Sequence, residues 1–439
     1  MRDKCIALLL STILLNSAFF WPLYFFWCIF FFLIPIFWYT RKYNKLFSFK
    51  DGFIWGVFFF TVHCSSFLQI LINKGCGQGR VLAYVLLVIY MSLHSGIWFF
   101  FANQLTKKVS VSLAWLAATV GYFFFMDHYI LWIFGVAYGY PFGNPLILLS
   151  VYPSLLFLLT TLTRYGLLSC IILFSWYMSA QTRGQKYVSF LCMIPFFTGF
   201  IIGIEDVVVP KYVQRIVIIT PSKVQRHPLD IAQEIAHKIT LVSQRYKRSN
   251  SIIIMPESSY PFPLNQQLDI VELWQTNSLI DKQTVIIGSH KIKNKKLFNS
   301  AYLISKCRIM QTYDKIKPTP ITECINFPLN KINFLKKLLL HDREPFNVGS
   351  SFKKFHIQPN ITFCPYICSD LFFSPKMYTK KTPLFLINDS WFQLNYIPRL
   401  MLYHAIFKTI EWQTSSIYVG HSNGIFIDKT GSQIPLFKI

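Results

Sequence analysis

The sequence predicts a multi-pass α-helical membrane domain followed by a layered α/β domain. Of the 439 residues, 53% are hydrophobic, 44 are Phe and only 14% are charged, whereas a soluble globular chain carries about 25% charged residues. Long apolar runs recur through residue 205 and then stop. From residue 211 onward, short β-branched runs alternate with amphipathic stretches, which is typical of an α/β domain. We therefore divide the chain into residues 1–206 and 207–439.

The first domain is predicted to cross the membrane seven times. A spanning helix needs roughly 20 apolar residues, and suitable stretches lie near 5–20, 21–39, 52–72, 82–103, 109–126, 156–180 and 187–205. Positive charge in short loops marks the cytoplasmic side, and most loop Lys and Arg fall on the side of the N-terminus. Seven spans therefore place residues 207–439 outside the cytoplasm.

Two features of the stretch 145–180 leave alternatives open. We interpret it as an interfacial segment at 145–155 and one span, but two helices would make eight spans and a cytoplasmic second domain. With the single span, Arg164 lies inside the membrane. An intramembrane arginine is a candidate functional residue, although its side chain could instead extend to a lipid phosphate.

Charge is divided unevenly between the two domains. Residues 1–206 carry 13 Lys and Arg against 5 Asp and Glu, and residues 207–439 carry 30 against 14. A basic domain tethered to a bilayer is attracted to anionic headgroups, by on the order of 1 kcal/mol for each Lys or Arg near the surface. No nucleic-acid-binding signature accompanies the charge. We therefore expect the membrane, and not nucleic acid, as the partner of this domain.

The second domain shows the elements of a layered α/β sandwich. Buried strands are predicted from short apolar runs bounded by turn residues, and amphipathic helices from the helical period. The predicted strands are 215–219, 251–255, 284–288, 301–304, 384–387 and 416–420, with a further strand at 425–428, and the predicted helices are 228–246 and 396–411.

Three residues at predicted strand ends suit acyl transfer. Glu257 follows one strand, Lys315 lies in Tyr-Asp-Lys, and Cys368 ends another. A carboxylate can take the thiol proton, the thiolate can attack a carbonyl, and an ammonium can stabilise the resulting oxyanion. By spacing alone this trio is a weak signal.

Several motifs resemble those of the apolipoprotein N-acyltransferase family, the membrane-embedded branch of the nitrilase (carbon–nitrogen hydrolase) superfamily. The family elements Pro-Glu-Ser/Thr-x-x-Pro, Tyr-x-Lys followed by Glu, and Ile-Cys match residues 256–261, Tyr313 with Lys315 and Glu323, and Ile367 with Cys368. An Asn-Asp-x-Trp-Phe segment at 388–392 and an Asn-Gly strand at 423–424 follow in order. The resemblance runs through nearly the whole chain.

The resemblance implies an α-β-β-α sandwich, Glu257 as general base, Lys315 as oxyanion stabiliser, Cys368 as nucleophile and Glu323 as a supporting carboxylate. We add as supporting residues Asp370, Asn388 and Trp391, the last as a candidate wall of the acyl pocket or, equally, as a core residue. The implied reaction moves an acyl chain from phospholipid, through a cysteine thioester, to the amine of a diacylglyceryl-cysteine on a lipoprotein. It implies no cofactor and no metal. The implied location is the bacterial inner membrane, with the catalytic domain periplasmic.

Departures from the family pattern leave an alternative function open beside lipoprotein N-acylation. The nucleophile is followed by Ser369 and Asp370, where the family carries Tyr and Glu, and the chain stops at Ile439 without the family's last helix. The alternative is a specialised membrane-anchored relative of the conjugal-transfer type that acts on another acyl or amide substrate. A soluble-substrate amidase and a pseudoenzyme are the remaining possibilities.

Three rival motifs have simpler explanations. Residues 420–424 fit G-x-S-x-G, but a nucleophile elbow needs a following helix and a strand is predicted there, so we interpret the segment as a hairpin near the active site. Cys364 is interpreted as a buried strand residue, and with Cys368 it lacks the second ligand pair of a zinc site. For His404 and His421 we expect surface or packing roles.

Overall fold

The computed structural model describes residues 2–66, 68, 79–130, 143–180, 182–202, 207, 209–222, 227–245, 251–276, 283–306, 308–319, 323–324, 331, 344–373, 381–391 and 396–439. The chain forms two compact units, one of Met1–Glu205 with Phe392–Glu411 and one of Asp206–Trp391 with Trp412–Ile439. The second unit is therefore not continuous in sequence, because the chain leaves it after Trp391 and returns at Trp412.

The first unit is helical. Its α-helices are α1 (Arg2–Phe20), α2 (Pro22–Phe25), α3 (Ile34–Tyr43), α4 (Phe49–His63), α6 (Gly79–Leu105), α7 (Val111–His128), α8 (Leu159–Met178), α9 (Arg183–Leu191) and α10 (Ile194–Ile202), together with most of α15 (Tyr396–Trp412). Within the described residues, four stretches are long and apolar enough to span a membrane: Arg2–Phe20, Pro22–Tyr43, Val81–Leu105 and Leu159–Met178. A multi-pass helical membrane domain is thus confirmed. The number of seven spans stays a prediction.

Two predicted membrane stretches of the first unit form short helices. The predicted interfacial segment forms two 3-10 helices, η4 (Pro145–Val151) and η5 (Pro153–Leu156). At about 2 Å of rise per residue, neither reaches across the roughly 30 Å of hydrocarbon, which disfavours the eight-span alternative. The predicted span 187–205 overlaps two shorter helices, α9 and α10, and Pro195 stands near the start of α10, where a proline is tolerated in a helix.

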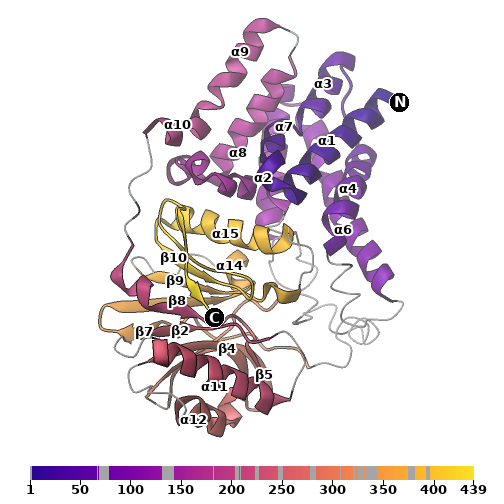
Figure 1. The fold of residues 1–439 in the computed structure, drawn as a ribbon. Helices are drawn as coiled ribbons and strands as arrows, with labels where there is room; N and C mark the ends of the chain where they lie inside the picture. Colours follow the sequence, from indigo (N-terminus) through magenta and orange to yellow (C-terminus); the bar gives the residue numbers. More distant parts are fainter. Residues whose placement is uncertain are drawn as a thin grey trace. The chain divides into compact units, whose positions relative to one another are not determined.

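The second unit contains two β-sheets (Figure 1). The first has the order β13-β1-β2-β4-β5-β6, with β3 paired to β4, and the second has the order β12-β11-β10-β9-β8-β7. Strands β1, β2 and β4 are parallel, as are β8, β9 and β10. The strands are β1 (Ile216–Ile218), β2 (Ile252–Ile254), β3 (Tyr260–Pro263), β4 (Thr284–Lys293), β5 (Lys296–Ser305), β6 (Arg308–Asp314), β7 (Phe355–Gln358), β8 (Ile361–Ile367), β9 (Thr382–Leu386), β10 (Ser416–Val419), β11 (Gly424–Ile427), β12 (Gln433–Pro435) and β13 (Phe437–Lys438).

Side-chain alternation explains why the sheets form layers. Successive strand residues point to opposite faces, so Val217 and Ile253 pack with helices α11 (Pro228–Arg245) and α12 (Leu268–Thr276) on the outer face of the first sheet. Ile216, Ile218, Ile252 and Ile254 face the other way, into a core shared with Phe363, Ile367, Leu384 and Leu386 of the second sheet. The layered α/β sandwich is thus confirmed, and the site residues lie where strands of both sheets end around this shared core.

Candidate active site

Glu257 follows β2 and is fixed by both of its carboxylate oxygens. Oε1 accepts hydrogen bonds from the Asn299 amide at 2.7 Å and from Lys315 Nζ at 3.1 Å, and Oε2 accepts one from the backbone N–H of Asn388 at 3.0 Å. The residue is 4% exposed. A carboxylate with three donors is held in a single orientation, which a general base requires.

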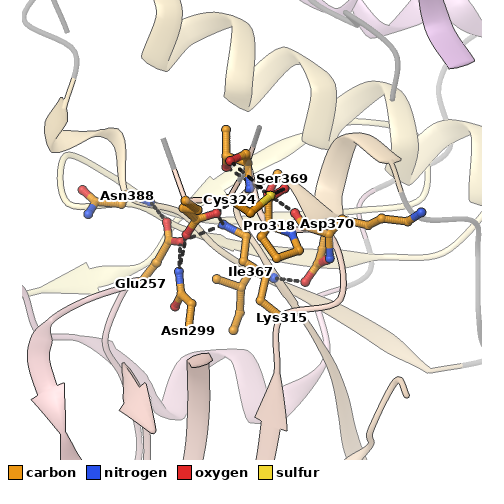
Figure 2. A network of polar contacts seen from close by, with 12 residues as sticks. Glu257, Asn299, Lys315, Pro318, Cys324, Ile367, Ser369, Asp370 and Asn388 are labelled. Atoms are coloured by element: carbon orange, nitrogen blue, oxygen red, sulfur yellow. Dashed lines mark hydrogen bonds and ion pairs between the residues drawn. The ribbon is translucent and has the colours of Figure 1, made fainter. Parts of the chain in front are cut away.

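Lys315 stands between two carboxylates. Its Nζ lies 2.7 Å from Glu323 Oε2 and 3.1 Å from Glu257 Oε1, and its side chain is 1% exposed. The backbone N–H of Thr319 also donates to Glu323 Oε2, at 2.6 Å. Buried charges are tolerated when they are paired and hydrogen-bonded, so the ammonium is held in place without access to bulk water. Figure 2 shows this network of side chains.

Asn299 joins the two carboxylates. Its Nδ2 donates to Glu257 Oε1 and to Glu323 Oε1, each at 2.7 Å. The neighbouring strands set its position, because the backbone N–H of Lys315 donates to the carbonyl of Asn299 at 2.8 Å and continues the antiparallel register of β5 and β6. Sequence reasoning missed this residue. The available signal was a polar Asn-Ser pair inside an apolar strand, where asparagine is normally depleted.

Cys368 sits on a turn between strand β8 and the short helix α14 (Asp370–Phe373). Its φ is 43°, a left-handed conformation that is uncommon for any residue other than glycine and is often found at functional sites. Its backbone N–H still donates to the carbonyl of Leu386 at 2.9 Å, which ties the turn to β9. The cysteine side chain also packs at the margin of the core between the sheets.

The two residues after Cys368 hold this turn against the segment that follows β6. The Asp370 carboxylate accepts hydrogen bonds from Tyr313 Oη at 2.7 Å, the Lys317 N–H at 2.8 Å and the Ile367 N–H at 3.1 Å. Ser369 Oγ donates to the carbonyl of Lys317 and accepts from Thr319 Oγ1. Side-chain hydrogen bonds thus join the turn at Cys368 to the segment that follows β6, and the Asp370 side chain is fully buried.

Burial and neighbouring charges set the protonation states of the site. Burial raises the pKa of Glu257 against the opposing effect of Lys315. Burial would also raise the pKa of Glu323, but Lys315 and the bonds from Thr319 and Asn299 lower it overall. Burial and the Glu257 charge raise the pKa of the Cys368 thiol well above its usual range, although Lys315 acts in the opposite direction. The Cys368 thiol is therefore neutral, and it would need a base to act as a nucleophile.

The remaining predicted residues lie on the second sheet. Asn388 follows β9 and contributes its backbone N–H to Glu257. The backbone of Trp391 belongs to the 3-10 helix η10 (Asp389–Trp391), and its side chain lies outside the described part of the chain. The G-x-S-x-G segment is the hairpin turn between β10 and β11, as predicted. Cys364 is buried within β8.

His421 and Asp389 are further residues near Glu257 that sequence reasoning did not assign to the site. Nε2 of His421 lies 3.2 Å from the carbonyl oxygen of Glu257. Asp389 accepts hydrogen bonds from the backbone N–H groups of His421 at 2.7 Å and of Ser422 at 3.2 Å. Asp389 therefore holds the hairpin turn that carries His421 next to Glu257.

Known proteins resemble this chain in sequence over part of its length. Apolipoprotein N-acyltransferase of Helicobacter pylori is 27% identical over 179 residues, 39% of each chain, and apolipoprotein N-acyltransferase 2 of Treponema denticola is 28% identical over 209 residues, 43% of this chain and 40% of the relative. The enzyme of Agrobacterium fabrum is 28% identical over 158 residues, 33% of this chain and 30% of the relative. The matched regions thus span about two fifths or less of these relatives. No family model matches the chain.

Solved structures resemble the chain more distantly. A CN-hydrolase superfamily protein from Xanthomonas campestris gives a TM-score of 0.34 at 13% identity and covers 50% of this chain and 86% of its own. A glutamine-dependent NAD+ synthetase from Acinetobacter baumannii gives 0.33 at 14% identity and covers 50% and 43%.

Proposed function

We propose that this chain, a member of the apolipoprotein N-acyltransferase family, is a membrane enzyme that acylates the N-terminal amine of lipoproteins. The observation that carries the proposal is the buried network of Glu257, Lys315, Glu323 and Asn299, which acts electrostatically on the Cys368 thiol. The membrane helices support lipid substrates, because a bilayer-embedded unit gives acyl chains lateral access.

The first step forms a thioester. Glu257 takes the proton of the Cys368 thiol, and the thiolate attacks the ester carbonyl of a phospholipid. Lys315 stabilises the tetrahedral oxyanion. Collapse breaks the ester C–O bond, and Glu257 returns the proton to the departing oxygen, so that lysophospholipid leaves and the acyl chain stays on sulfur.

The second step uses the same groups in reverse. The amine of a diacylglyceryl-cysteine attacks the thioester, and Lys315 again stabilises the oxyanion. Glu257 accepts the proton that the attacking nitrogen loses and gives it to the departing sulfur. The C–S bond breaks, an amide forms and the free thiol is regenerated.

A transfer assay tests the proposed function. The purified protein is mixed with vesicles of acyl-labelled phospholipid and a synthetic diacylglyceryl-cysteine peptide, and N-acyl peptide and lysophospholipid are measured together. We expect equal amounts of both products and neither with Cys368→Ala. Lysophospholipid without N-acyl peptide would favour the specialised relative with another acceptor. Absence of both products, with the protein folded, would reject acyl transfer from phospholipid.

A further inference from the structure

Two side chains of opposite charge hold the turn between β10 and β11. The Asp389 carboxylate accepts hydrogen bonds from the backbone N–H groups of His421 and Ser422, at 2.7 and 3.2 Å. The Lys438 ammonium donates to the backbone carbonyl oxygens of the same two residues, at 2.6 and 2.9 Å. All four backbone polar groups of these residues are therefore bonded to charged side chains. Hydrogen bonds of this kind are roughly twice as strong as those between neutral groups, so the turn is held in one conformation.

The residues that hold the turn come from two separate elements. Asp389 lies in η10 and is 2% exposed, and Lys438 lies in β13, beside Ile218 of β1. Glycines at both ends of the turn let it come close to these elements. A Cβ on Gly420 would lie 2.9 Å from Oδ2 of Asp389, and one on Gly424 would lie 2.4 Å from Cγ1 of Ile218. Contacts with η10, β1 and β13 thus define the position of the turn.

His421 contacts the backbone of the segment that carries Glu257. Its Nε2 lies 3.2 Å from the carbonyl oxygen of Glu257. A carbonyl oxygen only accepts hydrogen bonds, so Nε2 carries the hydrogen and donates it. The contact is made to the main chain and not to the carboxylate, which indicates that His421 holds the segment and does not take part in proton transfer.

The peptide group that His421 contacts adjoins a strained residue. Ser258 has a φ of 54°, in the left-handed region that is uncommon for residues other than glycine. Such a conformation persists only when its surroundings hold it in place. Rotation of the peptide group between Glu257 and Ser258 would change this φ and would turn the carbonyl oxygen away from His421. The hydrogen bond from His421 therefore opposes the rotation that would relieve the strain.

The carboxylate of Glu257 depends on the position of this same short segment. Its three donors lie at 2.7, 3.1 and 3.0 Å, and a displacement of the Glu257 backbone would weaken these bonds. We propose that His421 is a positioning residue for Glu257. It holds the Glu257–Ser258 peptide group in its strained orientation, and Asp389 and Lys438 hold His421. The inference rests on the proposed function for its effect on catalysis and on these hydrogen bonds for its physical basis.

Hydrogen–deuterium exchange of the full chain in lipid nanodiscs tests whether His421 holds this segment. His421→Phe removes the donor but keeps a ring, and we expect amide exchange at 257–260 to speed up about 3- to 10-fold, as the loss of one hydrogen bond predicts. His421→Gln keeps an N–H donor and should exchange as the wild type does. His356→Phe is the matched control, because His356 is an exposed histidine of β7 in the same unit. Exchange in β5 and β8 reports whether each variant is folded.

Lys438→Met tests the support of the turn. The substitution removes the ammonium from the two carbonyl oxygens, so we expect exchange to speed up at 420–423 and, by less than in His421→Phe, at 257–260. Lys353→Met, which removes an exposed lysine of the same unit, should change neither segment. If His421→Phe does not fold, Lys438→Met decides, because Lys438 is exposed. Wild-type exchange at 257–260 in that variant would then overturn the proposal.

Wild-type exchange at 257–260 in folded His421→Phe, or equal acceleration in His421→Gln and His421→Phe, would also overturn it. These readouts need no acyl transfer, so they remain decisive if the proposed function fails. Where transfer is detected, kcat should fall about 10-fold in His421→Phe, because a misplaced base lowers the rate, while KM for phospholipid is unchanged and His421→Gln restores kcat. A wild-type kcat in His421→Phe would contradict the positioning role.

Discussion

At the scale of single residues, the site balances one ammonium against two carboxylates. Lys315 is shared by Glu257 and Glu323, and this leaves one negative charge in excess. The amide of Asn299 donates to both carboxylates and so compensates part of that excess without adding a titratable proton. The two carboxyl groups differ in acidity as a result. The pKa of Glu257 is raised, whereas the pKa of Glu323 is lowered.

Removing the shared amide should impair transfer. Hydrogen bonds to charged groups contribute roughly 1.5–3 kcal/mol each, so we expect Asn299→Leu to lower kcat by about 10- to 100-fold. The single-turnover rate of Cys368 acylation measures this. Asn347→Leu is the matched control, because Asn347 bonds only to the carbonyl of Leu297 among the described contacts. Equal rates for Asn299→Leu and the wild type would show that the bridge is not needed.

The raised pKa of Glu257 predicts the acid side of the pH profile. The base must be ionised, and its ionised fraction falls as pH decreases through its pKa. Because burial raises that pKa, kcat/KM should begin to fall at a higher pH than an ordinary glutamate would give. Assays stopped at fixed times across pH 4–9 measure how kcat/KM depends on pH. This dependence reports the pKa of the general base in the free enzyme. An acid limb at or below the ordinary glutamate range would contradict Glu257 as the base.

The sequence located the charged site residues but not their connections. Glu257, Lys315 and Cys368 were predicted from their places at strand ends, which is a weak signal by spacing alone, together with the resemblance to the motifs of the N-acyltransferase family. Asn299, Tyr313 and Asp389 act through bonds that depend on the register of β5 with β6 and on the β10–β11 turn. Such pairings between distant segments cannot be derived from local spacing.

At the scale of elements, the backbone of β4 approaches Glu257 closely at Gly288. A Cβ on Gly288 of β4 would lie 2.5 Å from the Glu257 Cα and 2.5 Å from the carbonyl oxygen of Pro256. Only glycine therefore lets the segment after β2 pass so near to β4. The position of Glu257 thus depends on a residue that carries no functional group.

We expect Gly288→Ala to displace the base. Overpacking a tight site costs about 1–3 kcal/mol, so the unfolding midpoint should fall and transfer should fall with it. Gly184→Ala is the control, because its added Cβ meets nothing within 4 Å. Both variants are measured by thermal unfolding and by the transfer assay. Wild-type transfer by Gly288→Ala would show that the close approach does not set the geometry of Glu257.

The strands that could be predicted from the sequence are those in which nearly every side chain is buried. The apolar runs at 215–219, 251–255 and 284–288 form β1, β2 and part of β4, because short β-branched runs have few alternatives to a buried strand. Strand β6 was missed, since its exposed and partly buried residues include Arg308, Gln311 and Thr312. It is held by pairing with β5, which is a tertiary effect.

At the scale of the whole molecule, composition predicted two unlike parts but not the path of the chain between them. Hydropathy separated an apolar first part from a mixed second part, and the four candidate spans and two sheets among the described residues confirm this division. Residues 392–411 belong with the first unit, and this could not be predicted from the sequence. Amphipathic periodicity shows which face of a helix is apolar, but it does not show which other part of the chain that face packs against.

Seven spans predict that the catalytic domain lies outside the cytoplasm. A reporter fused at Ile439 of the full chain tests this topology. We expect activity from a periplasmic reporter such as alkaline phosphatase, and none from a reporter that folds only in the cytoplasm. A fusion after Lys108 should give the opposite result, because that loop is predicted to be cytoplasmic. A cytoplasmic signal at Ile439 would contradict the seven-span topology.

The most direct test of the central claim, a thioester on Cys368, is the intact mass of the protein after incubation with phospholipid alone. We predict one added acyl chain on the wild type and on Cys364→Ala, and none on Cys368→Ala. Hydroxylamine, which cleaves thioesters, should remove the adduct. An unmodified wild-type mass, or an undiminished adduct on Cys368→Ala, would contradict the account.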